Sequence, residues 1–217
     1  MAGKTVQVVD PESFFAAAHV SRETLTRLTH YESLLRKWQK SINLVARSTL
    51  ETAWQRHFWD SAQLLDAVPP DARKWVDLGS GAGFPGLVIA ILLAERPGFA
   101  MHLIESDQRK AVFLREVIRV TDAPAQVHTG RIEDPGTIAS IGVCDVVSAR
   151  ACAPLDRLLG WAAPYFGPET RGLFLKGAQV QEELTLARKS WTFSVTSRPS
   201  RADTDGTLLQ VEHLDRD

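Results

Sequence analysis

Residues 75 to 86 read Trp-Val-Asp-Leu-Gly-Ser-Gly-Ala-Gly-Phe-Pro-Gly, and this stretch decides how the rest of the chain is interpreted. A short apolar strand is followed by Gly79, Gly81 and Gly83 at every second position. Glycine adopts positive φ without strain and leaves room for a ligand against the backbone. An apolar run comes next, and Pro85 suits the first position of a helix there. The stretch therefore predicts a strand-loop-helix unit that binds an adenosyl cofactor.

The acidic residue of this stretch, Asp77, distinguishes between cofactors. Gly86 completes the G-x-G-x-x-G pattern of dinucleotide sites, so glycine spacing alone leaves NAD, FAD and S-adenosylmethionine (SAM) open. A pyrophosphate needs the unobstructed positive end of the helix. The methionine end of SAM instead carries an ammonium and a sulfonium, which a carboxylate near the loop would attract. We interpret Asp77, Gly79, Gly81 and Gly83 as a SAM loop; a tight turn without a ligand is the alternative.

Two later segments extend this predicted site. Glu105 ends the second predicted strand, where a carboxylate can accept both ribose hydroxyls of an adenosine. The alternative for Glu105 is a surface acid paired with Arg109 or Lys110. The turn after the third predicted strand can offer backbone groups and the Ile132 side chain to an adenine ring.

The composition is that of an ordinary soluble protein, with 44% hydrophobic and 24% charged residues among 217. Residues 1–10 contain no apolar signal segment, and the longest apolar run, 87–94, is far shorter than the ~20 residues of a membrane helix. We therefore expect a cytoplasmic protein without a membrane partner. Cys144 and Cys152 lack metal-ligand or disulfide-framework spacing, so we expect reduced thiols and no bound metal.

The formal net charge of −1 gives the whole chain no attraction to nucleic acid, so any RNA contact must be local. One candidate patch lies between residues 22 and 56, where basic residues outnumber acidic ones by four. Its cations are Arg22, Arg27, Arg36, Lys37, Lys40, Arg47 and Arg56. A solvated helix face would have the same composition.

The order of predicted elements indicates an α/β fold. Residues 10–70 read as helices that begin after Asp10 and Ser21, and Ser48 to Glu51 reads as the capping box of a third. Apolar strands then alternate with helices, which predicts a mostly parallel sheet covered on both faces. The expected strands are 75–78, 101–104, 125–129, 144–148 and 172–175, with an antiparallel edge pair at 191–196 and 208–214. We expect a single domain, 1–217, with a helical extension (10–70) on a SAM-binding core (71–217).

Several motifs together resemble one known family. They are Tyr31-x-x-Leu34-Leu35-x-x-Trp38, Asn43-Leu44, Arg56-His57-x-x-Asp60-Ser61, the glycine loop with Pro85-Gly86, Arg109-Lys110-x-x-Phe113-Leu114, Gly130-Arg131-x-Glu133, Ala149-Arg150-Ala151 and Leu175-Lys176-Gly177. Over roughly residues 12 to 190 the chain resembles the bacterial ribosomal RNA small subunit methyltransferase G family (RsmG, glucose-inhibited division protein B).

The resemblance implies a fold, a reaction and a cofactor. The fold is the seven-stranded, Rossmann-like fold of SAM-dependent methyltransferases. The reaction transfers a methyl group to N7 of one guanine in the decoding-region loop of 16S rRNA. The implied cofactor contacts are Gly79, Phe84, Ile132, Glu133 and Arg150. Family members often carry alanine where this chain has Ile132.

The implied chemistry requires alignment more than acid-base groups. Guanine N7 has an available lone pair and loses no proton on attack, so we assign no catalytic side chain. We expect Arg150 to orient the cofactor or base, with a salt bridge at the sheet rim as its alternative. His57 suits packing better than proton transfer. The predicted RNA contacts are Lys176, Arg56, Lys40 and Lys37; for Lys176, too, a salt bridge is the alternative.

Two other functions remain open from the residues alone. One is a SAM-dependent methyltransferase of a small molecule, with the N-terminal helices as a lid. The other is a SAM- or nucleotide-binding module without catalysis. The basic patch favours RNA, as free rRNA or as an assembling small subunit, and we expect a monomer.

Overall fold

The strands within residues 7–216, which the computed structural model describes, form one seven-stranded sheet with the order β3-β2-β1-β4-β5-β7-β6. They are β1 (Lys74–Leu78), β2 (Ala100–Glu105), β3 (Ala125–Thr129), β4 (Val146–Arg150), β5 (Arg171–Lys176), β6 (Trp191–Pro199) and β7 (Thr207–Arg216). The first five strands pair in parallel, whereas β7 is antiparallel to both β5 and β6. The predicted fold class and the antiparallel edge pair are confirmed.

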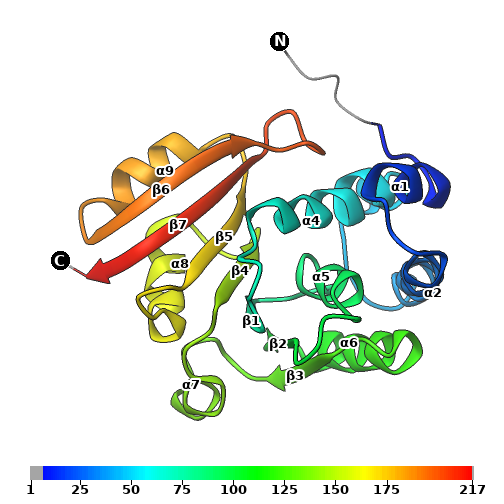
Figure 1. Cartoon of the computed structure of the whole chain (residues 1–217), viewed down its shortest axis with the longest axis horizontal. Coiled ribbons are helices and arrows are strands. Elements are labelled where there is room, and N and C mark those ends of the chain that lie inside the picture. The colour runs from blue at the N-terminus through cyan, green and yellow to red at the C-terminus, as the bar shows by residue number, and fades with distance from the viewer. Residues whose placement is uncertain (1–6, 217) are drawn as a thin grey trace.

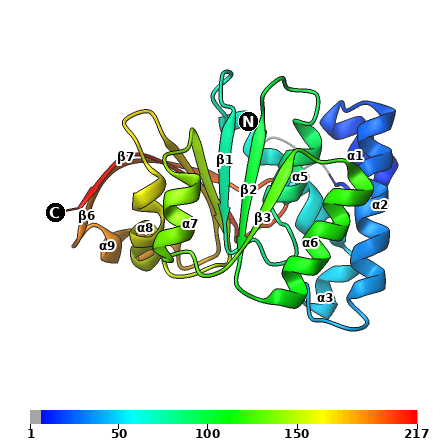
Figure 2. The same ribbon diagram turned by 90° about the horizontal axis from the view of Figure 1, so that it is seen from below.

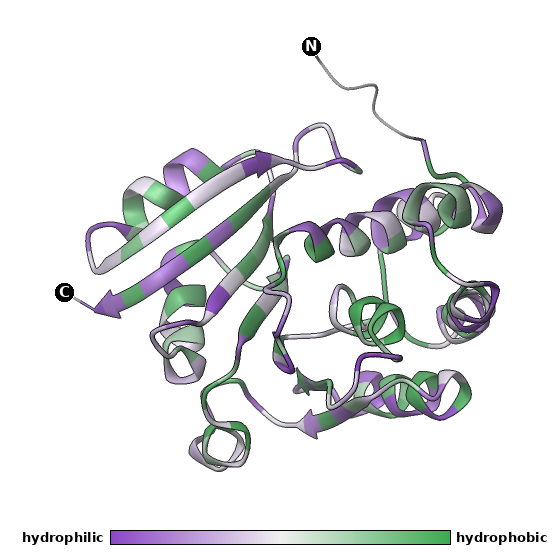
Figure 3. Cartoon of the chain, in the orientation of Figure 1, coloured by the Kyte–Doolittle hydropathy of each residue, from purple (hydrophilic) through white to green (hydrophobic). Residues whose placement is uncertain are grey.

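Helices cover both faces of the sheet (Figures 1 and 2). On one side lie α5 (Gly86–Leu92) and α6 (Gln108–Thr121), with α1 (Pro11–Ala18) and α2 (Arg22–Trp38) outside them. On the other side lie α7 (Pro135–Ile141), α8 (Leu155–Ala162), the 3-10 turn η3 (Ala163–Tyr165) and α9 (Val180–Ala187). Hydrophobic residues concentrate in α5 and along the central strands (Figure 3). Two apolar cores therefore flank the sheet.

The first two helices begin where the sequence predicted. Asp10 Oδ1 accepts a hydrogen bond from the Ser13 N–H at 2.8 Å, and Ser21 Oγ accepts one from the Thr24 N–H at 3.0 Å. Such side-chain acceptors satisfy free amide groups at a helix start. The buried residues of α2 recur at the predicted three-and-four spacing, and they are Leu25, Leu28, Tyr31 and Leu35.

The next segment differs from the sequence prediction. It breaks into α3 (Arg47–Leu50), the π-helical turn η1 (Trp54–Trp59), α4 (Asp60–Ala62) and the 3-10 turn η2 (Gln63–Ala67). The predicted capping box at Ser48 and Glu51 is wrong: α3 begins after Ala46, which makes no side-chain cap bond. Glu51 instead forms a 3.0 Å ion pair with Arg36 on α2. A tertiary contact has replaced the local one.

Two smaller differences concern helix starts. Helix α7 lies where no helix was predicted, although Asp134 before Pro135 repeats the Asp10-Pro11 signal and Asp134 Oδ2 accepts from the Thr137 N–H at 2.8 Å. Pro85 occupies the N-cap of α5 rather than its first helical position. Within residues 7–216, no helix is long and apolar enough to cross a lipid bilayer.

Candidate functional site

A cavity of about 800 Å³ opens at the carboxyl ends of the parallel strands. This is where open α/β sheets bind ligands. Its walls come from the glycine loop, the tips of β2, β4 and β5, the segment from α3 to α4, and the loop between β6 and β7. The predicted site residues that line the cavity are Gly79, Gly81, Phe84, Glu105, Arg150, Arg56 and Lys176.

The glycine loop has the backbone that the sequence predicted. Gly79, Gly81 and Gly83 have φ values of 65°, 57° and 92°, in the region that disfavours other residues. A Cβ at Gly83 would lie 2.6 Å from both the Tyr31 hydroxyl and Leu87. Tyr31 also donates its hydroxyl hydrogen to the Ala82 carbonyl, which ties α2 to the loop.

Glu105 lines the cavity in direct contact with the glycine loop. Its Oε2 accepts from the Gly81 N–H and its Oε1 from the Asp107 N–H, both at 2.7 Å. Among the residues that the structure describes, no ion pair joins Glu105 to Arg109 or Lys110, which were its alternative partners. The carboxylate is 7% exposed and each oxygen keeps a second lone pair. Glu105 therefore fixes the loop and still has acceptor capacity.

Asp77 lies beneath the loop instead of in the cavity wall. Side chains alternate along β1, so Asp77 shares a face with Trp75 and points toward Gly86 at the start of α5. Ser148 Oγ donates to Asp77 Oδ1 at 2.7 Å, whereas Oδ2 has no hydrogen-bond partner among the described residues. Burial raises the pKa of Asp77 to about 6, and the Ser148 bond opposes that shift. Asp77 therefore does not line the cavity, where direct contact with a ligand was expected.

The turn after β3 also lies outside the cavity wall. Ile132 is buried, and its carbonyl accepts from the Tyr165 hydroxyl at 3.0 Å. Glu133, next to it, is exposed. The Ile132 side chain reaches to within 3.9 Å of a Cβ built on Gly79. The turn therefore packs behind the first glycine of the loop.

Arg150, at the end of β4, connects the sheet to the helical segment above the cavity. Its Nη1 donates to the Arg56 carbonyl and to His57 Nδ1, both at 2.9 Å, and lies 3.6 Å from Asp60 Oδ2. The guanidinium carbon is 5.1 Å from the centre of the Phe84 ring. Both charged side chains of the Arg150–Asp60 pair are largely buried. The ion pair expected as an alternative is present, and it lies inside the site.

His57 is held on both ring nitrogens. Its Nδ1 accepts from Arg150, and its Nε2 lies 2.9 Å from Thr49 Oγ1, which is consistent with a neutral ring that donates to Thr49. The ring stacks on Phe84 with 4.9 Å between centres. Burial, then the charges of Arg150 and Arg56, lower the pKa of His57 to about 3. His57 is therefore a weak base in an anchoring position.

The loop between β6 and β7 closes one side of the cavity, a closure that no sequence pattern indicated. Ser200 Oγ donates to Asp60 Oδ1 at 2.9 Å, and the Gln63 side chain donates to the same oxygen at 2.7 Å. Arg56 forms a 2.8 Å ion pair with Asp203. Asp60 and Ser200 lie 140 positions apart in the chain, so no local pattern could pair them.

The four predicted RNA contacts differ in their surroundings. Lys176 is 8% exposed at its side chain, forms a 2.6 Å ion pair with Glu183 and donates to the Ala153 carbonyl at 2.7 Å. The Arg56 guanidinium forms an ion pair with Asp203. Lys37 and Lys40 are exposed at the C-terminal end of α2. Among these four described residues, Lys37 and Lys40 are exposed and form no ion pair, Arg56 is partly exposed but paired, and the Lys176 side chain is largely buried and paired.

Comparison with known sequences identifies the family. The model for "rRNA small subunit methyltransferase G" matches residues 24–204. A protein of Parvibaculum lavamentivorans named ribosomal RNA small subunit methyltransferase G is 67% identical over 208 residues, 96% of this chain and 91% of that protein. A protein of Rhodospirillum centenum with the same name is 56% identical over 201 residues, 93% and 89% of the two chains. The chain belongs to the rRNA small subunit methyltransferase G family.

Comparison with solved structures supports the fold. An O-methyltransferase-like protein from Klebsiella pneumoniae has a TM-score of 0.60 at 13% identity, covering 93% of this chain and 95% of that one. A mutant of MtNAS in complex with S-adenosylmethionine has a TM-score of 0.56 at 19% identity, covering 94% and 84%. The predictions of family, methyltransferase activity and SAM-dependent methyltransferase fold are confirmed.

Proposed function

We propose that this chain transfers the methyl group of SAM to N7 of a guanine in the decoding-region loop of 16S rRNA, as a cytoplasmic monomer. The names of its relatives support the rRNA substrate. The observation that carries the proposal is the composition of the cavity: a positive-φ glycine loop with Glu105 on one wall, and a buried cationic network around Arg150 on another.

The glycine loop and Glu105 fit an adenosyl group. A Cβ on Gly79 would lie 2.7 Å from Cys152 Sγ, so the wall leaves no room for a side chain there. Glu105, with acceptor capacity left on both oxygens, would hold the ribose hydroxyls. Gly81 would line the cofactor with its backbone, and Gly83 would set the turn.

Three further residues complete the proposed cofactor set. Phe84 presents its ring to the cavity beneath His57 and Arg150. Ile132 and Glu133 would act at the adenine end through the backbone of their turn, because the buried Ile132 side chain packs behind Gly79.

Asp77 would contribute by charge. At pH 7 its carboxylate is mostly ionised, since its pKa is about 6. A buried negative charge beneath the loop favours a cationic ligand above it. The positive charge moves from sulfonium to base during transfer, so Asp77 would favour both states and assist binding more than rate.

The chain's task in the methyl transfer is alignment. Bound SAM supplies an electrophilic methyl group, and guanine N7 brings its own lone pair. Holding reactants in line contributes ~7–11 kcal/mol through pre-organised orientation. Arg150 is fixed by Arg56, His57 and Asp60, and it would orient the cofactor or the target base. His57 is consistent with a reaction that needs no general base, because its pKa is about 3.

The proposed RNA contacts fall into two kinds. Lys37 and Lys40 are exposed and can meet phosphates directly. Arg56 and Lys176 would reach RNA only by exchanging a carboxylate, Asp203 or Glu183, for a phosphate.

Transfer of labelled methyl from SAM tests this function. Unmodified 16S rRNA, small-subunit particles and a small-molecule extract are offered separately, and labelled RNA is mapped by strand cleavage at 7-methylguanine. We expect label at one guanine in RNA or particles. Label only in the extract would favour the small-molecule enzyme, and SAM binding with no transfer would favour the non-catalytic module.

A further inference from the structure

A second hollow lies beside the cavity, between the loop that follows α2 and the start of α6. Four cations line it, Lys40 and Arg47 on one wall and Arg109 and Lys110 on the other, and we call it the basic groove. Lys110 lines both the basic groove and the cavity. The two hollows therefore meet at this side chain.

One carboxylate, that of Asp107, lines the basic groove together with its four cations. Within residues 7–216, no ion pair involves Lys40, Arg47 or Lys110, and the only one of Arg109 is a 3.8 Å contact with Asp107. Asp107 Oδ1 is already used as the N-cap of α6, accepting the Arg109 and Lys110 N–H groups at 2.8 and 3.3 Å.

Most of the remaining cations of the N-terminal patch are neutralised in pairs. Arg22 pairs with Glu12, Arg27 with Glu23 and Glu95, and Arg36 with Glu32 and Glu51. Within this patch of the described chain, the cations that form no ion pair are Lys37, Lys40 and Arg47, all at or after the end of α2. Charge that is concentrated in this way marks a surface for a polyanion.

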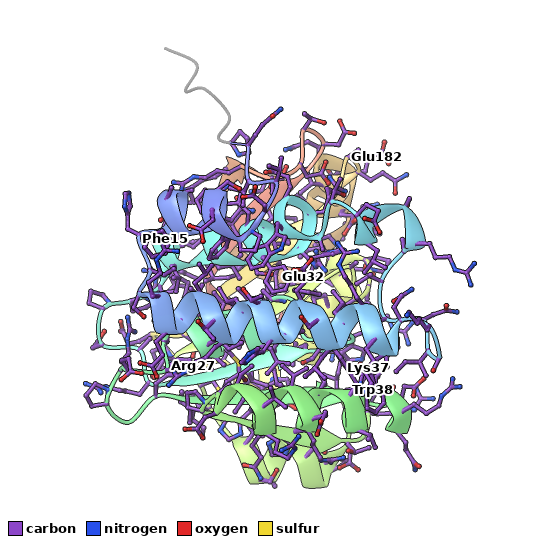
Figure 4. All side chains as sticks on the ribbon, turned by 90° about the vertical axis from the view of Figure 1, so that its right-hand side faces the viewer. Phe15, Arg27, Glu32, Lys37, Trp38 and Glu182 are labelled. Atoms are coloured by element: carbon purple, nitrogen blue, oxygen red, sulfur yellow. The ribbon has the colours of Figure 1, made fainter. Side chains whose placement is uncertain are left out.

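Both walls of the basic groove are held in place. The Gln39 side chain accepts from the Leu44 and Val45 N–H groups at 3.0 Å and donates to the Val45 carbonyl at 2.9 Å, which fixes the loop carrying Lys40. Trp38 packs edge-on against Phe113 of α6, with ring centres 5.8 Å apart. Figure 4 shows Lys37 and Trp38 at this end of α2, beside α6.

The lining of the basic groove suits phosphates rather than bases. Among the described residues that line it, Ile42 is the sole large apolar side chain and none is aromatic. Bases bind without sequence readout by stacking on aromatic rings, whereas Lys and Arg bind the phosphate backbone. We propose that the basic groove binds phosphates of the RNA strand next to the nucleotide that enters the cavity. This inference rests on the proposed function and assigns new RNA contacts to Arg47, Arg109 and Lys110.

A charge-matched pair of double variants tests the proposal. Lys40→Ala with Arg47→Ala removes two groove cations at exposed positions. Lys189→Ala with Arg119→Ala removes the same charge outside both hollows. KM for 16S rRNA or particles, kcat, SAM affinity by calorimetry and equilibrium RNA binding are measured at several salt concentrations.

We expect the groove variant to raise KM for RNA about ten-fold or more and to flatten the slope of log affinity against log salt by about 1.5, as two lost phosphate contacts require. Its kcat at saturating RNA and its SAM affinity stay at the wild-type values, and the control variant matches wild type throughout. Lys40→Arg with Arg47→Lys, which keeps the charge, restores RNA affinity.

The outcomes separate this inference from the proposed function. If wild type methylates RNA and the groove variant keeps the wild-type KM and salt slope, the groove assignment and the proposed Lys40 contact are wrong, and the proposed methyl transfer to RNA stands. A groove variant that loses SAM affinity as well points to a structural role and also overturns the assignment. If wild type neither binds nor methylates RNA, both proposals fail.

Discussion

The glycine loop and the polar cover of the cavity are built by different means. In the loop, three positive-φ glycines and the close approach of Tyr31 and Leu87 leave one backbone path. In the cover, Arg150 joins β4 to Arg56, His57 and Asp60, which lie far earlier in the chain. The loop depends on steric exclusion along a short segment. The cover depends on buried charged and polar groups from distant parts of the chain, which contact one another only in the folded protein.

This difference predicts opposite responses to substitution. The loop is destabilised when atoms are added, because they clash with its close neighbours. The cover is destabilised when atoms are removed, because a charge loses its partner. A buried ion pair costs desolvation energy whether or not it is complete, so removing one member leaves the other uncompensated. We therefore expect the cover to be the more fragile region, and the following variants test that ranking.

The largest effect is expected from Arg150→Met. Asp60 then keeps Ser200 and Gln63 but loses its cation, and the free energy of unfolding falls by about 3–5 kcal/mol, the cost of leaving a buried charge unpaired. Adding Asp60→Asn recovers part of that loss, which urea unfolding of both variants measures. A decrease below about 1 kcal/mol in Arg150→Met would contradict the ranking.

The next prediction compares alanine substitutions at two glycines of the loop. Gly83→Ala places a Cβ 2.6 Å from Tyr31 and Leu87, so overpacking adds to the strain of positive φ. We expect the free energy of unfolding to fall by about 2–4 kcal/mol. A Cβ on Gly81 would have its nearest atom 3.8 Å away, so Gly81→Ala adds only the backbone strain of positive φ. The free energy of unfolding should then fall by about 1–2 kcal/mol. Urea unfolding compares them, and equal losses would show that crowding is not what fixes the loop.

The last prediction concerns Asp77→Asn, at the junction of the two regions, and it is a gain of stability instead of a loss. The folded-state pKa of Asp77 is raised from 3.8 to about 6, so its contribution to stability is fully present below pH 4 and is lost as the pH rises through 6. Asparagine has no such titration. At pH 7 the variant should therefore be more stable than wild type by about 1–3 kcal/mol, while it binds SAM more weakly.

Thermal and urea unfolding from pH 4 to 8 measure this difference. The stability gap between Asp77→Asn and wild type should shrink as the pH falls toward 4, because protonation of Asp77 removes its charge. A gap that does not vary with pH would mean that packing, and not the carboxylate charge, sets the effect. Calorimetry with SAM at pH 7 tests the cost to binding.

Much of the architecture could be predicted from local sequence. Alternating apolar strands and helices, the caps at Asp10 and Ser21, and the glycine loop each depend on residues a few positions apart. The failed capping box at Ser48 and Glu51 marks the limit. Its acid found a tertiary partner, Arg36, that no nearby pattern indicates.

The site was predicted less completely than the fold. Glu105 and Arg150 line the cavity as expected, because strand ends meet at one edge of a parallel sheet, and Phe84 lines it from the glycine loop. Their cofactor contacts stay predictions. Asp77, Ile132 and Glu133 do not line it. The pleat of β1 turns Asp77 toward α5, and Tyr165 holds the turn at Ile132. For Lys176 the sequence left two alternatives, an RNA contact and a salt bridge, and the structure shows an ion pair with Glu183.

The sequence by itself determined the alternation of strands and helices that builds the parallel core and the conformation of the glycine loop, because these depend on short-range sterics and on periodicity. The family followed from the resemblance of several separate motifs. Only the tertiary structure decided which charges remain available. Arg22, Arg27, Arg36 and Arg56 are neutralised by partners, while Lys40 and Arg47 are not among the ion pairs of the described residues. Electrostatic pairing depends on distance in space, and folding sets that distance between residues that the chain order keeps far apart.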